Sequence, residues 1–401
     1  MKIGILSLFI FIIVLIFFSF VSYKNYDKDP YGDIIIGNTS LPTNKYHLHR
    51  DFTVEKVASG QVPTSIDFAS DGRLFFSELR GQIKVITNGM TNIFASVPDS
   101  QTPFVEKGES GLFSVAIDPG FDNNKYVYVY YISKGTGKIG RYKDSGGMGK
   151  NFEIIFDGIT QGKIHNGGDL NFGPDGKLYL STGDATEIKI KLGTKNPAQD
   201  TMNKNGKILR MNKDGSIPND NPIPGSYTYA YGFRNVYGFA IDKSGNIFAS
   251  DNGIDCCDEL NFVKPNKNYG WPLEMGIVEK SEYEQPIYAW NKENRIAPTG
   301  MSFYYGNKYS KEYVGNLFIN SWRNREIYRF IQNDGKIYLV ESFLVDDLYD
   351  LAPITGMHAG EIHEGQVTDS GSAKESEGLL DIEQGPDGLL YFSDVRGIYR
   401  M

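Results

Sequence analysis

A short phrase, in which Asp-Gly or a close variant separates two runs of β-forming residues, constrains the fold of this chain more than any other feature. Clear copies lie at Phe68–Phe76, Phe172–Leu180, Ile241–Phe248 and Gln384–Tyr391, and looser copies begin at Ile117 and Tyr313. Glycine supplies the positive φ that a tight hairpin requires, so each copy predicts two paired strands. The six copies lie about 50 to 75 residues apart with little amphipathic helix between them. Six small antiparallel sheets of this kind predict an all-β, six-bladed β-propeller.

The length of the chain argues against the main alternative, a two-sheet sandwich. The chain has 401 residues, whereas a sandwich rarely needs more than about 250. The formal net charge is −8, and no run of Lys or Arg occurs. A nucleic-acid partner would need a basic face, so the composition excludes this class of function.

The N-terminal segment differs in composition from the rest of the chain. An apolar run of about twenty residues extends from Ile3 to Ser22, enough to span a bilayer. Bulky residues follow where a signal peptidase prefers small ones, which favours an uncleaved anchor over a cleaved signal. We therefore expect a membrane anchor or signal over 1–23, a polar tether over 24–50 and the propeller over 51–401. The propeller is then expected outside the cytoplasm, attached to the membrane, or secreted if the segment is removed.

One of the five histidines lies in a sequence that suits catalysis. His165 precedes Asn166 and two glycines at the entry to a predicted strand, and Asp184 ends the same hairpin. If the two strands pair, the carboxylate can orient the imidazole, which is the arrangement that a general base needs. A structural role for His165 in a turn is the alternative.

Two further clusters carry polar groups. Arg234 and Asn235 lie between glycines and offer donors to a planar anion, or else Arg234 pairs with a buried carboxylate. The segment Asp251–Asn261 is rich in oxygen ligands of the kind that Ca²⁺ prefers, although its spacing is not that of an EF-hand.

Together these motifs resemble the glucose/sorbosone dehydrogenase family of soluble pyrroloquinoline quinone (PQQ) sugar dehydrogenases, over about residues 55 to 400. The motifs that carry the resemblance are Glu78–Ile83, Gly108–Leu112, Asp118–Phe121, His165–Gly168, Gly206–Arg210, Gly232–Asn235, Asp258–Asn261, Asn268–Pro272, Ala297–Gly300 and Gly385–Gly388.

The resemblance implies PQQ on the central face of a six-bladed propeller, oxidation of an aldose sugar at C1 to the lactone, and an external electron acceptor. It assigns the catalytic base to His165, with Asp184 as its partner. It implies cofactor contacts at Glu109, Arg234, Asn235 and Arg323, and a calcium ion on the carbonyls of Gly253 and Ile254. It also matches Glu259 and Tyr269 to a further calcium site of some relatives.

The chain departs from the family pattern at several of these positions. Glu109 stands where some relatives carry Gln, and Ile254 replaces Pro. Relatives carry Arg-x-Arg just before the last Asp-Val and Gly-Pro-Asp-Gly, where this chain reads Gly378–Ile382 without a basic residue. Arg396 on the next strand is a candidate substitute. These departures keep two alternatives open: a propeller that binds a ligand or protein without turnover, and a calcium-dependent propeller lactonase.

The only two cysteines, Cys256 and Cys257, are adjacent, so a disulfide framework and a Cys₄ zinc site are excluded. They are either two reduced residues that pack a loop, or a vicinal disulfide that stiffens the Gly253–Ile254 segment. An extracytoplasmic location permits the oxidised form.

Overall fold

The computed structural model describes residues 52–98, 109–186, 196–254, 256–333, 336–344 and 378–401. These residues all belong to a unit that spans Asn44–Met401. The predicted anchor and tether lie outside them, as do Asp255 and every histidine except His165. Within the described ranges, no helix is long and apolar enough to cross a membrane.

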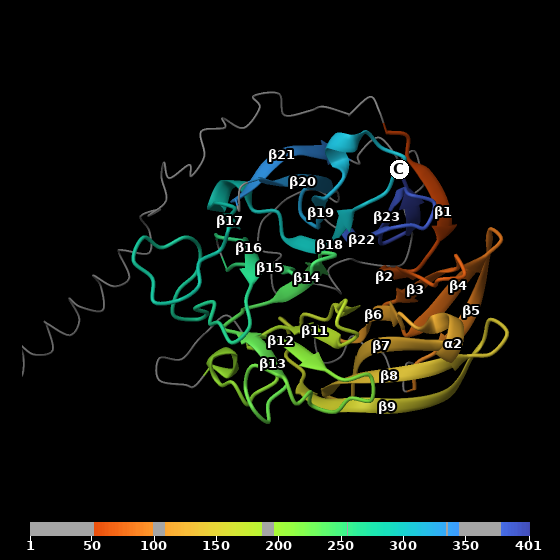
Figure 1. Cartoon of the computed structure of the whole chain (residues 1–401), viewed down its shortest axis with the longest axis horizontal. Coiled ribbons are helices and arrows are strands. Elements are labelled where there is room, and N and C mark those ends of the chain that lie inside the picture. Colours follow the sequence, from red (N-terminus) through yellow and green to blue (C-terminus); the bar gives the residue numbers. More distant parts are fainter. Residues whose placement is uncertain (1–51, 99–108, 187–195, 255, 334–335, 345–377) are drawn as a thin grey trace, which may run out of the picture. The chain divides into compact units, whose positions relative to one another are not determined.

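Six four-stranded antiparallel sheets surround a common centre (Figure 1), which confirms the predicted six-bladed propeller. Blade 1 is β2 (Pro63–Phe68), β3 (Leu74–Glu78), β4 (Gln82–Thr87) and β5 (Met90–Ser96); blade 2 is β6 (Gly111–Ile117), β7 (Tyr126–Ser133), β8 (Thr136–Asp144) and β9 (Gly149–Thr160); blade 3 is β10 (Leu170–Phe172), β11 (Leu178–Thr182), β12 (Lys207–Met211) and β13 (Thr228–Tyr231). Blade 4 is β14 (Val236–Ile241), β15 (Ile247–Asp251), β16 (Glu259–Val263) and β17 (Tyr288–Ala289); blade 5 is β18 (Pro298–Tyr304), β19 (Asn316–Ser321), β20 (Glu326–Asn333) and β21 (Lys336–Leu344); blade 6 is β22 (Leu379–Gln384), β23 (Leu390–Asp394), β24 (Gly397–Arg400) and β1 (Glu55–Ser59).

Blade 6 closes the ring, because its outermost strand β1 comes from the start of the described chain and pairs with β24 near its end. Glu55 lies opposite Arg400 in this pairing, and their side chains form an ion pair of 2.7 Å. In the described parts of the chain, four short helical turns interrupt the strands: α2 (Phe121–Asn124), η1 (Pro197–Gln199), η2 (Lys292–Asn294) and η3 (Lys311–Tyr313).

The recurring sequence phrase is the hairpin between the first two strands of each blade. In the Asp-Gly copies, Gly72, Gly176 and Gly388 adopt φ values of 87°, 72° and 83°. The preceding aspartate accepts a backbone hydrogen bond two residues ahead, as Asp175 does from Lys177. Asp and Gly therefore fix the turn, and the turn fixes the register of the two strands.

Six apolar clusters stabilise the ring, and each lies between two neighbouring blades. Phe75 and Ile83 of blade 1 pack with Val115 and Tyr131 of blade 2, for example, and the other five junctions are built in the same way. Because each junction buries the faces of two sheets, the blades support one another.

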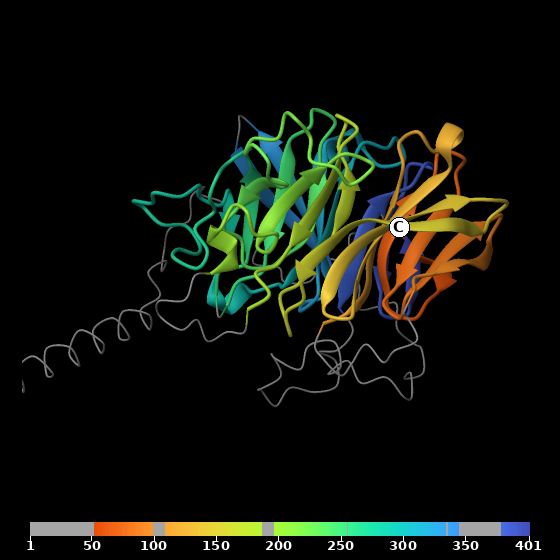
Figure 2. The same ribbon diagram turned by 90° about the horizontal axis from the view of Figure 1, so that it is seen from below.

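The topology places particular loops on one face of the ring, which Figure 2 shows from the side. In every blade the first strand is innermost and runs antiparallel to the second. The loops that enter the first strands and the loops that leave the second strands therefore lie on the same face, hereafter the site face. The Asp-Gly hairpins lie on the opposite face.

Candidate active site

All the site residues predicted from the resemblance, except Tyr269, lie in or beside the loops of the site face. The loops before the first strands carry Glu109 (blade 2), His165 (blade 3), and Arg234 and Asn235 (blade 4). The loops after the second strands carry Asp184 (blade 3), Gly253 and Ile254 (blade 4), Arg323 (blade 5) and Arg396 (blade 6), and Glu259 begins β16. Blades 3 and 4 supply the densest group.

The structure brings His165 and Asp184 together, as the predicted pairing of β10 with β11 requires. The Nδ1 atom of His165 lies 3.1 Å from Oδ1 of Asp184, and both side chains are buried. The Nε2 atom of His165 is buried without a hydrogen-bond partner among the described residues. Since Asp184 accepts the proton on Nδ1, Nε2 keeps its lone pair and is available as a base.

Glycines allow the two loops to approach this closely. A Cβ atom on Gly183 would lie 2.0 Å from the carbonyl oxygen of His165, and one on Gly167 would lie 2.8 Å from the backbone nitrogen of Gly183. His165 itself has a φ of 62°, an uncommon value for a residue other than glycine. The surrounding contacts therefore hold the imidazole in a conformation that the local sequence alone would disfavour.

Asp184 is the centre of a hydrogen-bond network that extends beyond His165. Its Oδ2 atom accepts from Trp271 Nε1 at 2.7 Å and from Thr186 Oγ1 at 2.5 Å, and its Oδ1 atom accepts from the Thr186 backbone at 3.0 Å. Burial alone would raise the pKa of Asp184, but the bonds from His165 and Thr186 hold it below its usual value. The carboxylate therefore stays ionised and keeps the imidazole oriented.

The same surroundings favour the neutral form of His165. Burial lowers the pKa of His165, and the nearby charge of Arg234 lowers it further, although Asp184 partly opposes both effects. A neutral imidazole with a free Nε2 is the form that can accept a proton.

Arg234 is almost completely buried and retains hydrogen-bonding capacity. Its Nη1 atom donates to the carbonyls of Asn252 at 2.7 Å and Gly253 at 3.0 Å. Its Nε and Nη2 atoms have no partner among the described residues, and its guanidinium carbon lies 5.6 Å from the centre of the Trp271 ring. Buried donors without acceptors are costly, so this position is suited to an anionic ligand.

Asn235 and Glu109 border the same region. The Oδ1 atom of Asn235 accepts from the backbone of Gly167 at 2.9 Å, which ties blade 4 to the histidine loop. The Oε2 atom of Glu109 accepts from both the backbone and the side chain of Asn166, each at 3.2 Å. Burial raises the pKa of Glu109 to about 7, so its charge changes near neutral pH.

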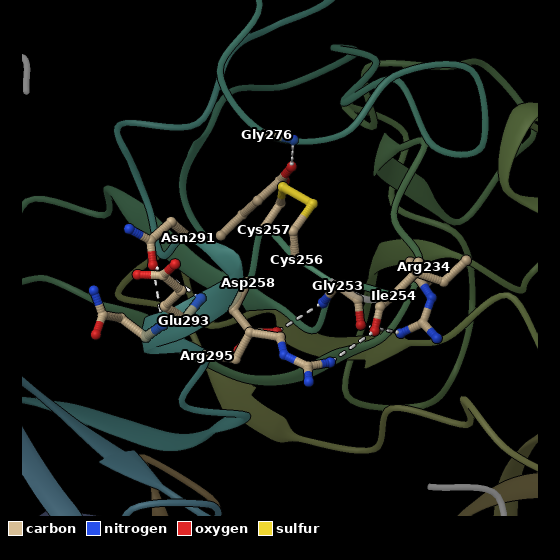
Figure 3. Close-up of a disulfide and its surroundings, with 12 residues drawn as sticks. Arg234, Gly253, Ile254, Cys256, Cys257, Asp258, Gly276, Asn291, Glu293 and Arg295 are labelled. Atoms are coloured by element: carbon tan, nitrogen blue, oxygen red, sulfur yellow. Dashed lines mark hydrogen bonds between the residues drawn. A yellow bond between two sulfur atoms is a disulfide. The ribbon is translucent and has the colours of Figure 1, made fainter. Parts of the chain in front are cut away.

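The carbonyls predicted to hold calcium both point at arginines. Gly253 O accepts from Arg234, and Ile254 O accepts from Arg295 Nη1 at 3.4 Å (Figure 3). Each oxygen has a second lone pair, and carbonyl oxygen is a suitable calcium ligand. Across the described ranges no group of three or more His, Cys, Asp or Glu side chains gathers as a metal site. These two carbonyl oxygens are therefore of a type that suits calcium, and the cofactor and water would have to supply the other ligands.

The other predicted calcium ligands are engaged within the fold. Glu259 is buried and accepts from Asn261 and from the backbone of Gly276. The hydroxyl of Tyr269 donates to Phe262 O at 2.6 Å and accepts from the Lys264 backbone at 2.9 Å. The Tyr269 hydroxyl is therefore committed to the backbone of blade 4.

Cys256 and Cys257 are joined as the vicinal disulfide, directly beside the Gly253–Ile254 carbonyls (Figure 3). A Cβ atom on Gly253 would lie 2.0 Å from the carbonyl oxygen of Cys256, so the disulfide loop packs tightly against this segment.

Arg323 and Arg396 lie on the site face, in other blades. Arg323 is exposed in the turn after β19, where its backbone donates to Ile296 O at 3.0 Å. Arg396 is largely buried in the turn after β23, and its backbone donates to Asp394 at 2.8 Å. Their roles as cofactor contacts stay predictions.

Sequence reasoning missed two residues of this site, Trp271 and Arg295. Both lie within or beside motifs that carry the resemblance, but both reach the site from long loops of blade 4 or its border with blade 5. No local spacing indicates the contact of Trp271 with a carboxylate 87 residues earlier.

Comparisons with known proteins agree with this geometry. The Glucose / Sorbosone dehydrogenase family model matches residues 60–397. Quinoprotein glucose dehydrogenase B of Acinetobacter calcoaceticus is 33% identical in an alignment of length 245 that covers 53% of this chain and 51% of that protein. Aldose sugar dehydrogenase YliI of Escherichia coli is 27% identical in an alignment of length 325 that covers 74% of this chain and 77% of that protein.

Among solved structures, the PQQ-bound form of aldose sugar dehydrogenase from Streptomyces coelicolor superposes with a TM-score of 0.68 at 27% identity. The match covers 87% of this chain and 98% of that one. The family match extends over most of the chain and includes strands of all six blades. The chain therefore belongs to the glucose/sorbosone dehydrogenase family.

Proposed function

We propose that this protein oxidises an aldose sugar at C1 to the lactone, with PQQ as cofactor and an external electron acceptor. The observation that carries the proposal is the His165–Asp184 pair with its free Nε2 atom, next to the unpaired donors of Arg234. A base and a buried cation side by side suit a reaction in which a hydroxyl loses a proton beside an anionic cofactor.

The roles of the residues follow from their contacts. Asp184 fixes the proton on Nδ1 of His165, and Nε2 takes the proton of the sugar C1 hydroxyl. Arg234 and Asn235 orient the cofactor, and the enclosing loops of blades 3 and 4 limit the access of water. When bound, PQQ supplies a quinone that accepts the hydride. Calcium, held on the carbonyls of Gly253 and Ile254, is part of the proposal and would offset the negative charge of the cofactor.

We further propose that the apolar N-terminal run holds the propeller at a membrane, outside the cytoplasm. Mass spectrometry of the mature chain tests this. A chain that begins near residue 23 would mean that the segment is a removed signal.

Reconstitution tests the enzymatic proposal. Purified apoprotein is mixed with PQQ and Ca²⁺, and dye reduction is followed with a panel of aldoses. We expect turnover that falls by about 10²–10⁴-fold in His165→Ala, and loss of PQQ affinity after chelation of calcium. PQQ binding without turnover on any aldose would favour the non-catalytic alternative, and turnover of lactones alone would favour the lactonase.

A further inference from the structure

Two arginine side chains from different loops converge on adjacent backbone carbonyls of the site (Figure 3). Arg234 donates to Gly253 O at 3.0 Å, and Arg295 donates to Ile254 O at 3.4 Å. Both guanidinium groups keep buried N–H groups with no acceptor in the described parts of the chain: Nε and Nη2 of Arg234, and Nε of Arg295. An unpaired buried donor carries a full desolvation cost, so a ligand that brings an acceptor to these groups gains affinity.

The position of Arg295 is fixed by its neighbours. Both oxygens of the Asp258 carboxylate bind backbone N–H groups: Oδ1 accepts from Gly253, and Oδ2 accepts from the two residues that follow Arg295, at 2.9 Å in each case. One buried carboxylate thus joins the loop of Arg295 to the Gly253–Ile254 segment. Arg295 follows the short helix η2, whose start is capped by the side chain of Asn291. Its backbone is therefore held at both sides.

Among the described residues, Asp258 is a carboxylate that interacts electrostatically with Arg295, but its oxygens already accept three backbone hydrogen bonds. It therefore balances the charge of Arg295 without accepting a hydrogen bond from it in this part of the structure. The segment Gly378–Ile382, for which the family resemblance implies two arginines, offers no basic residue. A carboxylate placed between Arg234 and Arg295 would satisfy the unpaired donors of both.

We propose that Arg295 acts with Arg234 to bind a carboxylate group of the anionic quinone cofactor, in place of the basic pair absent from Gly378–Ile382. This inference rests on the proposed PQQ-dependent function and adds a cofactor-binding residue to it. A charge-assisted hydrogen bond of this kind contributes roughly 10- to 100-fold in affinity.

The test is a binding titration rather than an activity assay. Wild-type apoprotein, Arg295→Gln and Arg295→Lys are titrated at fixed Ca²⁺ with PQQ and with its trimethyl ester, and tryptophan fluorescence reports binding. Arg400→Gln is the matched control, because Arg400 pairs with Glu55 on the outer strands of blade 6. Melting temperatures confirm that each variant is folded.

We expect the Kd for PQQ to rise roughly 10- to 100-fold in Arg295→Gln, to rise less in Arg295→Lys and to stay unchanged in Arg400→Gln. The Kd for the ester should change little in all variants. Failure of the wild type to bind PQQ would overturn the proposed function and this inference together.

Normal wild-type binding with an unchanged Kd in Arg295→Gln would overturn the inference alone. Equal losses for PQQ and its ester would also overturn it, since Arg295 would then act through the shape of the loop. If Arg295→Gln does not fold, Arg295→Lys decides. A lysine ammonium cannot reproduce both the donation to Ile254 O and the donation from Nε, so a Kd for PQQ equal to that of the wild type would overturn the inference.

Discussion

Replacement of Asp184 by asparagine should inactivate the enzyme without unfolding it. The carboxylate presents two acceptor oxygens, one to His165 Nδ1 and the Thr186 backbone, the other to Trp271 Nε1 and the Thr186 hydroxyl. An amide has one oxygen and one NH₂ group. Whichever way it is turned, one N–H group must face another.

The contacts indicate which orientation the amide adopts. With NH₂ toward Trp271, two donors would lie 2.7 Å apart, whereas with NH₂ toward the Thr186 backbone they would lie 3.0 Å apart. The second arrangement is less crowded, and its NH₂ donates to Nδ1 of His165. The imidazole proton then moves to Nε2, the atom that has to accept the proton of the sugar.

The expected magnitudes follow from these two effects. One poorly paired buried donor costs about 1–3 kcal/mol of stability, which for a domain of this size lowers the melting temperature by a few degrees. Loss of the base should lower kcat by about 10²–10⁴-fold, while the Kd for PQQ changes little.

The assay combines dye reduction by the PQQ-loaded enzyme with ¹⁵N NMR of the imidazole, which distinguishes the two tautomers. Asp220→Asn is the control, because the Asp220 carboxylate pairs with Arg210 away from the site face. A folded Asp184→Asn protein that keeps kcat within twofold of the wild type would refute the reasoning. A proton that stays on Nδ1 despite lost activity would refute the tautomer argument.

Three further predictions concern other parts of the molecule. Trp271→Phe keeps an aromatic ring beside Arg234 but removes the hydrogen-bond donor to Asp184. Because about 1.5 kcal/mol of charge-assisted bonding is lost, we expect kcat to fall roughly tenfold. Unchanged steady-state kinetics would contradict this. Burial raises the pKa of Asp67 from 3.8 to about 7, so the folded state binds the carboxyl proton more tightly than the unfolded state does. The stability that this proton contributes is complete below about pH 4. It is lost as the pH rises through 7, by up to about 1.4 kcal/mol per pH unit. Thermal melting should therefore show a flatter decline between pH 5 and 8 in Asp67→Asn than in the wild type, and an equal slope would count against the assignment. Mild reduction of Cys256–Cys257 should weaken PQQ or calcium binding before the propeller unfolds, because the disulfide loop packs against the carbonyl segment; two free thiols in natively isolated protein would exclude this.

The parts of the structure that the sequence predicts are those set by local pairing. Each Asp-Gly phrase defines a hairpin, and six hairpins define six blades. The His165–Asp184 contact follows from one such hairpin, since the two residues lie at the same end of β10 and β11. Pairing of neighbouring strands fixes their ends relative to each other, so residues there can be placed without knowledge of the whole ring.

Contacts between loops of different hairpins could not be predicted in this way. Trp271 reaches Asp184 from a long loop after β16, and Arg295 reaches Ile254 across 41 residues. The path of such a loop depends on packing and on buried anchors such as Asp258, whose three backbone hydrogen bonds leave no pattern in the sequence. Family resemblance indicates the motifs, but the partner of each side chain depends on the folded loops.

The distribution of charge over the site face has a consequence for where an anion binds. On the blade 4 side, Arg234 and Arg295 offer unpaired donors around Gly253 and Ile254. On the blade 6 side, the inner strand presents Leu380 and Asp381, which line a small central cavity with residues of blades 1 to 5. Burial raises the pKa of Asp381 to about 7, so near neutral pH this side chain of the inner strand carries partial negative charge. We therefore expect an anionic ligand to bind nearer to Arg234 and Arg295 than to the inner strand of blade 6, and so beside the free Nε2 atom of His165.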